Sequence, residues 1–378
     1  MKITNNKYLC FLGVLIMLSI SGCVVETPEG SPVITSDIPG SNGINFIFSK
    51  GLEGYNCYRI PALLRVSDKV LLAFAEGRKT GCGDSGNIDM VLKRSIDNGR
   101  NWSQNIIVWD DAENTCGNPA PVFDKDTGEI LLLTSWNNDK VFLIKSSDLG
   151  LTWNTPEEIT EDVKPTSWTW YATGPGSGIQ IKNGPNTGRL VVGCDHNDQG
   201  RSYSHVIYSD DHGANWSLGG INPLDNTNEC EVAELSNNDL MLNMRNTDGS
   251  QKRRKVSISS DGGLSWNYRG IDNTLVSPVV QSSLHRYSFV GDEINENILL
   301  FSNPADVADR KNMTLRISND DGNTWLKSIR LNDGFAAYSD LANYPNKRAA
   351  ILYEAGYTPA DRYQGISFET INIENDEQ

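Results

Sequence analysis

The sequence contains few of the residues that bind transition metals. Its 378 residues include four histidines and seven cysteines, and no two cysteines form a Cys-x-x-Cys pair. Zinc sites in proteins are built from closely spaced cysteines and histidines, so we expect neither a metal nor any other cofactor.

Basic residues are also in the minority. There are 33 lysines and arginines against 48 aspartates and glutamates, which gives a formal net charge of −15. This charge repels nucleic acid and anionic membrane surfaces, and we expect neither as a partner. A small anionic ligand would have to be held by a local cluster of arginines.

The main apolar run lies near the N-terminus, over Tyr8–Leu18, and is too short to span a bilayer comfortably. Two lysines precede it, and small residues ending at Cys23 follow it. This order is typical of an export signal, and the cysteine after small residues resembles a bacterial lipobox. We expect residues 1–22 to be a lipoprotein signal peptide, Cys23 to carry a lipid and residues 23–43 to be a flexible tether.

The signal predicts an exported protein that is lipid-anchored to the bacterial outer membrane, with secretion as the alternative. Contact with the membrane would then be through the lipid alone. Residues 44–378 show no second break in composition, so they are expected to form one domain. That domain contains five cysteines, and this odd number implies at least one free thiol.

One eight-residue pattern, Ser-x-Asp-x-Gly-x-x-Trp, occurs five times. We call these segments the Asp boxes; they are Ser95–Trp102, Ser146–Trp153, Ser209–Trp216, Ser259–Trp266 and Ser318–Trp325. Aspartate and glycine suit a tight turn between two strands, and each box follows a strand-like run. The spacing is that of propeller blades, and the boxes are expected to be structural.

A second repeat gives the number of blades. Six apolar runs begin at Leu71, Leu131, Leu190, Leu240, Leu299 and Ile351. They predict an all-β fold, a six-bladed β-propeller of four-stranded antiparallel blades, with a last strand over Ile366–Ile373. Polar side chains five residues into the first four runs should converge on the axis; they are Glu76, Trp136, Asp195 and Arg245.

The segment Tyr58-Arg59-Ile60-Pro61, followed by the five Asp boxes, resembles the sialidase family of glycoside hydrolases. The resemblance runs from Tyr58 to the last strand. It implies a retaining exo-α-sialidase that hydrolyses terminal α-linked sialic acids from glycoproteins, glycolipids and oligosaccharides through a tyrosyl intermediate.

Sialic acid carries a carboxylate on its anomeric carbon, and guanidinium groups suit a carboxylate well. The family uses three arginines from different blades, and by local context they match Arg59, Arg245 and Arg310. Supporting substrate-binding roles are implied for Arg78, Glu76 and Glu354, of which Glu354 would orient Arg59. We expect Arg253, Arg254 and Arg269 to form surface ion pairs and Arg316 to be structural.

A carboxylate nucleophile would be repelled by the carboxylate of the substrate, and sialidases use a tyrosine instead. The segment Ala337-Tyr338-Ser339-Asp340 matches that tyrosine, so Tyr338 is the predicted nucleophile. Glu229, sixteen residues before Arg245, matches its base, with Glu231 as the alternative. Nearby arginines are expected to lower the pKa of the phenol.

The family places its acid/base aspartate on a loop that matches Asp84, with Asp89 as the alternative. Cys82 is not general in the family, and we expect it to pair with Cys116 and hold this loop. The resemblance also implies that Tyr171 and Trp168 face the substrate and that Asn118 contacts it.

Two other functions remain open from the sequence. One is a sialic-acid-binding lectin on a propeller without turnover, and the other is a trans-sialidase. No catalytic position is lost, which favours hydrolysis over the lectin. The catalytic domain is expected to be a monomer.

Overall fold

The computed structural model describes residues 44–357 and 362–374, which form β-strands and one short helix, α1 (Thr160–Val163). The predicted signal peptide, Cys23 and the tether lie outside the described residues. Within the described part of the chain, no helix is both long and apolar enough to cross a membrane.

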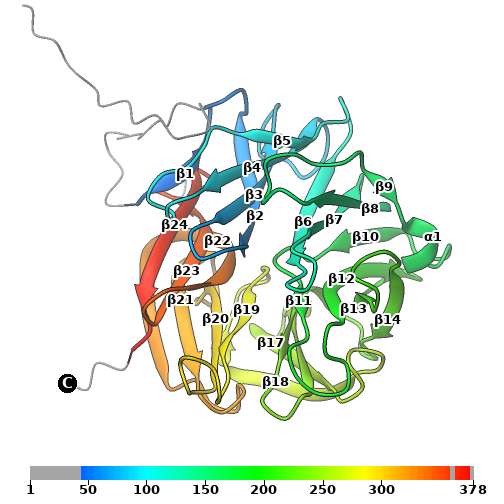
Figure 1. Ribbon diagram of the computed structural model, residues 1–378, viewed down its shortest axis with the longest axis vertical. Coiled ribbons are helices and arrows are strands. Elements are labelled where there is room, and N and C mark those ends of the chain that lie inside the picture. Colours follow the sequence, from blue (N-terminus) through cyan, green and yellow to red (C-terminus); the bar gives the residue numbers. More distant parts are fainter. Residues whose placement is uncertain (1–43, 358–361, 375–378) are drawn as a thin grey trace, which may run out of the picture.

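Four antiparallel sheets of four or five strands each form a blade, and they follow one another around a central axis in sequence order (Figure 1). The first contains β2 (Cys57–Arg65), β3 (Leu71–Arg78), β4 (Ile88–Ser95) and β5 (Ile106–Trp109). The second contains β6 (Cys116–Phe123), β7 (Ile130–Trp136), β8 (Lys140–Ser146) and β9 (Glu157–Glu158). The third contains β10 (Trp170–Thr173), β11 (Ile179–Gln180), β12 (Leu190–Asp198), β13 (Arg201–Ser209) and β14 (Ser217–Ile221). The fourth contains β15 (Thr227–Glu234), β16 (Leu240–Asn246), β17 (Arg253–Ser259) and β18 (Asn267–Val276).

A fifth sheet of seven strands completes the β-propeller arrangement. It contains β19 (Ser283–Ser288), β20 (Ile298–Pro304), β21 (Lys311–Ser318), β22 (Lys327–Tyr344), β23 (Arg348–Gly356), β24 (Gly365–Asn372) and β1 (Phe46–Ser49). The N-terminal strand β1 pairs with the C-terminal strand β24, which closes the ring (Figure 1).

All six apolar runs of the sequence lie in strands, namely β3, β7, β12, β16, β20 and β23. These strands are buried on both faces because their sheets pack against neighbouring sheets. The core is therefore divided into clusters between sheets. In one of them Leu72 of β3 packs with Leu132 of β7.

The Asp boxes are turns that pack against a neighbouring blade. In each box the serine hydroxyl donates to the aspartate at 2.7–2.9 Å and accepts from the glycine N–H at 2.8–3.0 Å. The Gly99 backbone has a φ of +78° and lies against Phe368 of β24. This geometry explains why the turn requires glycine.

Candidate active site

Four central strands are irregular at the positions where the sequence predicts site residues. The pairing register shifts between Arg59 and Ala62 in β2, and between Gly117 and Ala120 in β6. It also shifts between Thr227 and Cys230 in β15, and between Ala336 and Ser339 in β22. A bulge of this kind changes the direction of nearby side chains. Arg59, Asn118, Glu229 and Tyr338 therefore lie at or within these bulges.

Arg59 is held in place by Glu354 of β23. Its Nε and Nη2 donate to the two carboxylate oxygens at 2.9 and 3.1 Å, and Glu354 also accepts from the backbone N–H groups of Ile60 and Tyr338. Both side chains are buried. Burial alone would lower the pKa of Arg59, but the Glu354 carboxylate raises it, so the guanidinium stays charged. Glu354 does not bind Arg59 Nη1, so this nitrogen can donate to another group.

Tyr338 of β22, Glu229 of β15 and Arg245 of β16 meet in one hydrogen-bonded group. The Tyr338 hydroxyl donates a short hydrogen bond to Glu229 Oε1. Arg245 Nη1 donates to Glu229 Oε2 at 2.6 Å and to the Tyr338 oxygen at 3.2 Å. The phenol thus has a base to receive its proton and a cation beside its oxygen.

The three arginines lower the pKa of Tyr338 as expected, but the net pKa of the side chain is raised. Burial has the largest effect and raises the pKa of the phenol, and the Glu229 carboxylate raises it further. Together these two effects outweigh the lowering of the pKa by Arg245, Arg59 and Arg310. Tyr338 therefore keeps its proton at neutral pH. Ionisation of the phenol requires transfer of the proton to Glu229.

Arg310 lies in the connection between β20 and β21, and it also lies close to Tyr338. Its Cζ lies 5.8 Å from the Tyr338 ring centroid, and Arg59 Cζ lies 5.2 Å from the same centroid. Arg310 donates to the hydroxyl of Tyr363 and to the carbonyl of Val279, each at 3.2 Å. The three arginines predicted to grip a carboxylate therefore surround one tyrosine.

Asp84 lies on the loop after β3, and two arginines bind it. Arg78 Nη1 donates to its Oδ1 at 2.7 Å, and Arg59 Nη1 donates to the same oxygen at 3.2 Å. Burial would raise the pKa of Asp84, but the charge and hydrogen bond of Arg78 outweigh it and lower the pKa. The side chain is 78% exposed, so water reaches the carboxylate.

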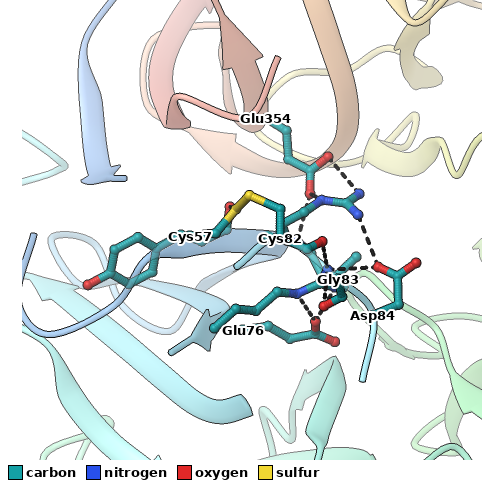
Figure 2. The surroundings of a disulfide bond; sticks show 10 residues. Cys57, Glu76, Cys82, Gly83, Asp84 and Glu354 are labelled. Carbon is teal, nitrogen blue, oxygen red and sulfur yellow. Dashed lines mark hydrogen bonds and ion pairs between the residues drawn. A yellow bond between two sulfur atoms is a disulfide. The ribbon is translucent and has the colours of Figure 1, made fainter. Parts of the chain in front are cut away.

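The predicted Cys82–Cys116 disulfide is wrong. Cys82 pairs with Cys57, and their Cα atoms are 5.3 Å apart (Figure 2). Cys57 lies two residues before Arg59, and Cys82 lies two residues before Asp84. The bond therefore joins the strand of the arginine to the loop of the aspartate. Cys116, Cys194 and Cys230 are buried free thiols.

Arg78 adds a second restraint on this loop. Its Nη1 also donates to the carbonyls of Cys82 and Gly83, at 2.6 and 2.9 Å, and its Nη2 pairs with Glu76. Glu76 in turn accepts from the backbone N–H of Asn118 at 2.9 Å. Asp84 is thus bound by Arg78, Arg78 by Glu76, and Glu76 by the backbone of Asn118.

Neither of the two alternative carboxylates lies with the arginines. Asp89 is buried and accepts from the Tyr55 hydroxyl at 2.6 Å and from Lys79 at 2.9 Å. Glu231 accepts from Gln281, Ser283 and the backbone of Leu284. Glu231 also borders a separate cavity of about 440 Å³ toward the other ends of β2, β15 and β22.

Tyr171 and Trp168 are buried rather than open to a ligand. Tyr171 is 0% exposed, and its hydroxyl lies 3.0 Å from His205 Nε2. Trp168 stacks on His196. The expectation that these two aromatics face the substrate is therefore not met. The neighbouring Trp170 is exposed.

The arginines outside the site do not all have the surroundings that the sequence predicts. Arg254 was expected at the surface but is buried, and it donates to the Asn243 side chain and the Val280 carbonyl. Arg253 donates to carbonyl oxygens, and Arg269 donates to the side chain of Asn323, so neither of these contacts is an ion pair. Arg316 is buried and donates to Asn303, in agreement with a structural role.

Sequence reasoning missed Tyr363, which touches two of the arginines. It lies in the connection between β23 and β24, outside any motif that the sequence offered. Its only signal in the sequence is its position nine residues after Glu354.

Among the described residues, Asp124, Asp126 and His212 are grouped closely enough to bind a cation. They lie after β6 and in the third Asp box, not beside Tyr338. Asp124 already accepts from Thr127, Gln180 and His212. The group is therefore explained by its own hydrogen bonds.

Residues 69–351 match the family model of the BNR repeat-like domain. The sialidase of Micromonospora viridifaciens is 32% identical over 386 residues, which cover 94% of this chain and 56% of that protein. The sialidase of Bacteroides fragilis is 29% identical over 358 residues, which cover 84% of this chain and 64% of that protein. The chain thus spans less than two thirds of the length of either relative.

Two solved structures are also similar to this chain. A Hadza microbial sialidase is 29% identical with a TM-score of 0.79, over 87% of this chain and 68% of that one. A leech intramolecular trans-sialidase is 20% identical with a TM-score of 0.74, over 87% of this chain and 70% of that one. At that lower identity the likeness shows a shared fold alone.

Proposed function

The chain belongs to the sialidase family of glycoside hydrolases, and from this premise we propose that it is a retaining exo-α-sialidase acting on terminal sialic acids of glycans. The observation that carries the proposal is the hydrogen bond from the Tyr338 phenol to Glu229, with three arginines around the same ring. Sialidases are the glycosidases that use tyrosine in place of a carboxylate nucleophile.

Substrate binding would begin at the arginines. Arg59 lies in β2, Arg245 in β16 and Arg310 in the connection between β20 and β21. Guanidinium groups held in fixed positions bind a carboxylate through charge-assisted hydrogen bonds. The net charge of the chain is −15, so this local cluster has to outweigh a repulsive overall field. The carboxylate would hold the anomeric carbon near the Tyr338 oxygen.

In the first chemical step Tyr338 would attack the anomeric carbon. Its proton passes to Glu229, and the hydrogen bond from Arg245 stabilises the negative charge that develops on the phenol oxygen. Asp84 would donate its proton to the glycosidic oxygen as that bond breaks. The product of this step is a tyrosyl glycoside and a free aglycone.

In the second step Asp84 would take a proton from water, and the resulting hydroxide would attack the anomeric carbon. The tyrosyl oxygen leaves and recovers its proton from Glu229. Two displacements at one carbon give net retention of configuration. Asp84 suits contact with water because its side chain is 78% exposed.

Asp84 must be protonated to act as an acid, yet Arg78 and Arg59 lower its pKa. A substrate carboxylate would compete with Asp84 for Arg59 Nη1 and place a negative charge nearby. Both effects raise the pKa of an aspartate. Substrate binding would therefore prepare the acid.

The number of blades and the cell location also belong to this proposal. The first half of β22 pairs with β21 and the second half with β23, which supports counting the seven-stranded sheet as two blades, six in all. We further propose that residues 1–22 direct export, that Cys23 carries a lipid and that 23–43 tethers a monomeric domain to the outer membrane. The order of the N-terminal residues supports this part.

The test is release of a fluorogenic aglycone from an α-linked sialoside by the purified chain, followed by proton NMR of the sugar product. We expect turnover and initial formation of the α-anomer. Saturable binding without turnover would contradict the proposal and favour a lectin. Transfer of the sugar to an acceptor glycan, or an anhydro product, would favour a trans-sialidase.

A further inference from the structure

Tyr363 connects two of the three arginines. Its hydroxyl oxygen accepts a hydrogen bond from Arg310 Nη1 at 3.2 Å, and Arg59 Cζ lies 4.1 Å from its ring centroid. The ring packs edge-on against Phe335, with the centroids 5.0 Å apart. One side chain therefore fixes the relative position of two guanidinium groups that come from different parts of the chain.

The contact with Arg59 is made by the face of the Tyr363 ring, because Arg59 Cζ lies over that ring. Glu354 already binds Nε and Nη2 along one edge, and Asp84 reaches Nη1. A guanidinium over the face of an aromatic ring is attracted to it, and this contact uses none of its N–H donors. The ring of Tyr363 thus holds Arg59 while Nη1 stays able to bind an anion.

The hydroxyl of Tyr363 has one hydrogen left to donate. A phenol offers one O–H donor and two acceptor lone pairs, and Arg310 uses a lone pair. Within residues 44–357 and 362–374, no acceptor takes the O–H of Tyr363. The donor lies beside Arg59 and Arg310, where the carboxylate of a sialoside would bind.

We propose that Tyr363 is a further substrate-binding residue, whose O–H donates to one oxygen of the sialic acid carboxylate while its ring positions Arg59. This inference rests on the proposed sialidase function. A carboxylate has room for several donors, and a phenol adds one without adding charge. A hydrogen bond to an anionic oxygen is stronger than one to a neutral oxygen, so Tyr363 would favour a carboxylate over a neutral group at the same position.

The test is Tyr363→Phe, which keeps the ring over Arg59 and against Phe335 and removes the O–H. Tyr357→Phe is the matched control, because Tyr357 lies in the same connection and packs on Phe46 instead. We expect KM for a fluorogenic sialoside to rise about tenfold with kcat changed by less than about twofold, since uniform binding is lost. The control should match the wild type.

A second measurement separates binding of the carboxylate from a structural role. The probe is 2,3-unsaturated sialic acid and its methyl ester, titrated by calorimetry. Tyr363→Phe should weaken the acid about tenfold and the ester less than about threefold. Equal weakening of both probes, or unchanged affinity in a folded variant, would overturn the inference. If the wild type binds the acid without turning over any sialoside, the proposed function fails, while the comparison of acid and ester still decides the role of Tyr363.

Discussion

The hydroxyl of Tyr338 in β22 donates a hydrogen bond to the carboxylate of Glu229 in β15, although the two residues are 109 positions apart in the sequence. The bulges in both strands place the two side chains together. Because burial and Glu229 raise the pKa of the phenol, Tyr338 is a weak nucleophile until Glu229 accepts the proton. The pair therefore acts as one unit.

Tyr338→Phe should reduce kcat on an α-sialoside by on the order of 10³-fold or more. Tyr338 and Glu229 act as one catalytic unit, so the loss of one residue also removes the contribution of the other. Affinity for 2,3-unsaturated sialic acid should stay within about threefold of the wild type, since the arginines remain. Steady-state kinetics and calorimetry measure the two effects. Tyr287→Phe is the control, because the Tyr287 hydroxyl donates to the Tyr344 carbonyl on another part of β22. Activity close to that of the wild type in Tyr338→Phe would rule out the tyrosine as nucleophile.

The Cys57–Cys82 disulfide should matter for catalysis as well as for stability. It closes 25 residues of sequence, and loop closure of that size is worth about 3 kcal/mol. We expect Cys82→Ser to lower the free energy of unfolding by that order and to lower kcat more than it raises KM, because the Asp84 loop loses a restraint. Chemical denaturation and kinetics measure these changes.

Cys116→Ala is the control for that experiment, since Cys116 is a buried free thiol. Peptide mapping without reductant should recover the Cys57 and Cys82 peptides joined. A Cys82 peptide joined to Cys116 would contradict the structure. Unchanged kcat in Cys82→Ser would show that Arg78 alone holds the loop.

The strands and most site positions could be predicted because both leave a local pattern. Apolar runs and Asp boxes recur at blade spacing, and Arg59, Glu229 and Tyr338 lie in short matching segments. The pairing of Cys82 could not be predicted, since five cysteines allow many pairings and only the fold brings Cys57 to the loop. Tyr363 was missed because its partners come from distant segments.

Electrostatic expectations were the least reliable because they depend on burial. The sequence places arginines near Tyr338 and so predicts a lowered pKa, but the side chain is 6% exposed and its desolvation dominates. Arg253 and Arg254 are neighbours in one strand, and successive residues of a strand point to opposite faces, so the two side chains cannot share one environment. The side chain of Arg254 points inward and is buried.

The pH dependence of activity should respond to Arg78. Arg78 lowers the pKa of Asp84, and a catalytic acid with a low pKa loses its proton early as the pH rises. Replacing both members of the pair, Glu76→Gln with Arg78→Gln, removes this cation without leaving Glu76 buried and unpaired. The pKa of Asp84 should then rise, and the alkaline limb of kcat/KM should move to higher pH.

Glu76→Gln alone is the control, because Arg78 keeps its bond to Asp84 in that variant. Its alkaline limb should not move to higher pH. The pH profiles of kcat/KM for the three proteins measure the effect. An alkaline limb that stays in place in the double variant would show that Asp84 is not the acid that sets it.

The Asp boxes should affect stability and not chemistry, and two glycines allow a matched test. Gly99 in the first box and Gly51 in the loop after β1 both have a φ of +78°. A Cβ on Gly99 would lie 2.3 Å from Phe368, whereas a Cβ on Gly51 would meet no atom within 4 Å. Alanine therefore imposes the same backbone strain at both positions and a clash between blades at only one.

Gly99→Ala should lower the free energy of unfolding by about 1–3 kcal/mol more than Gly51→Ala, as measured by chemical denaturation. At a temperature where both variants are folded, kcat/KM should equal that of the wild type. Equal destabilisation by the two substitutions would show that contact with Phe368 does not stabilise the closed ring of blades.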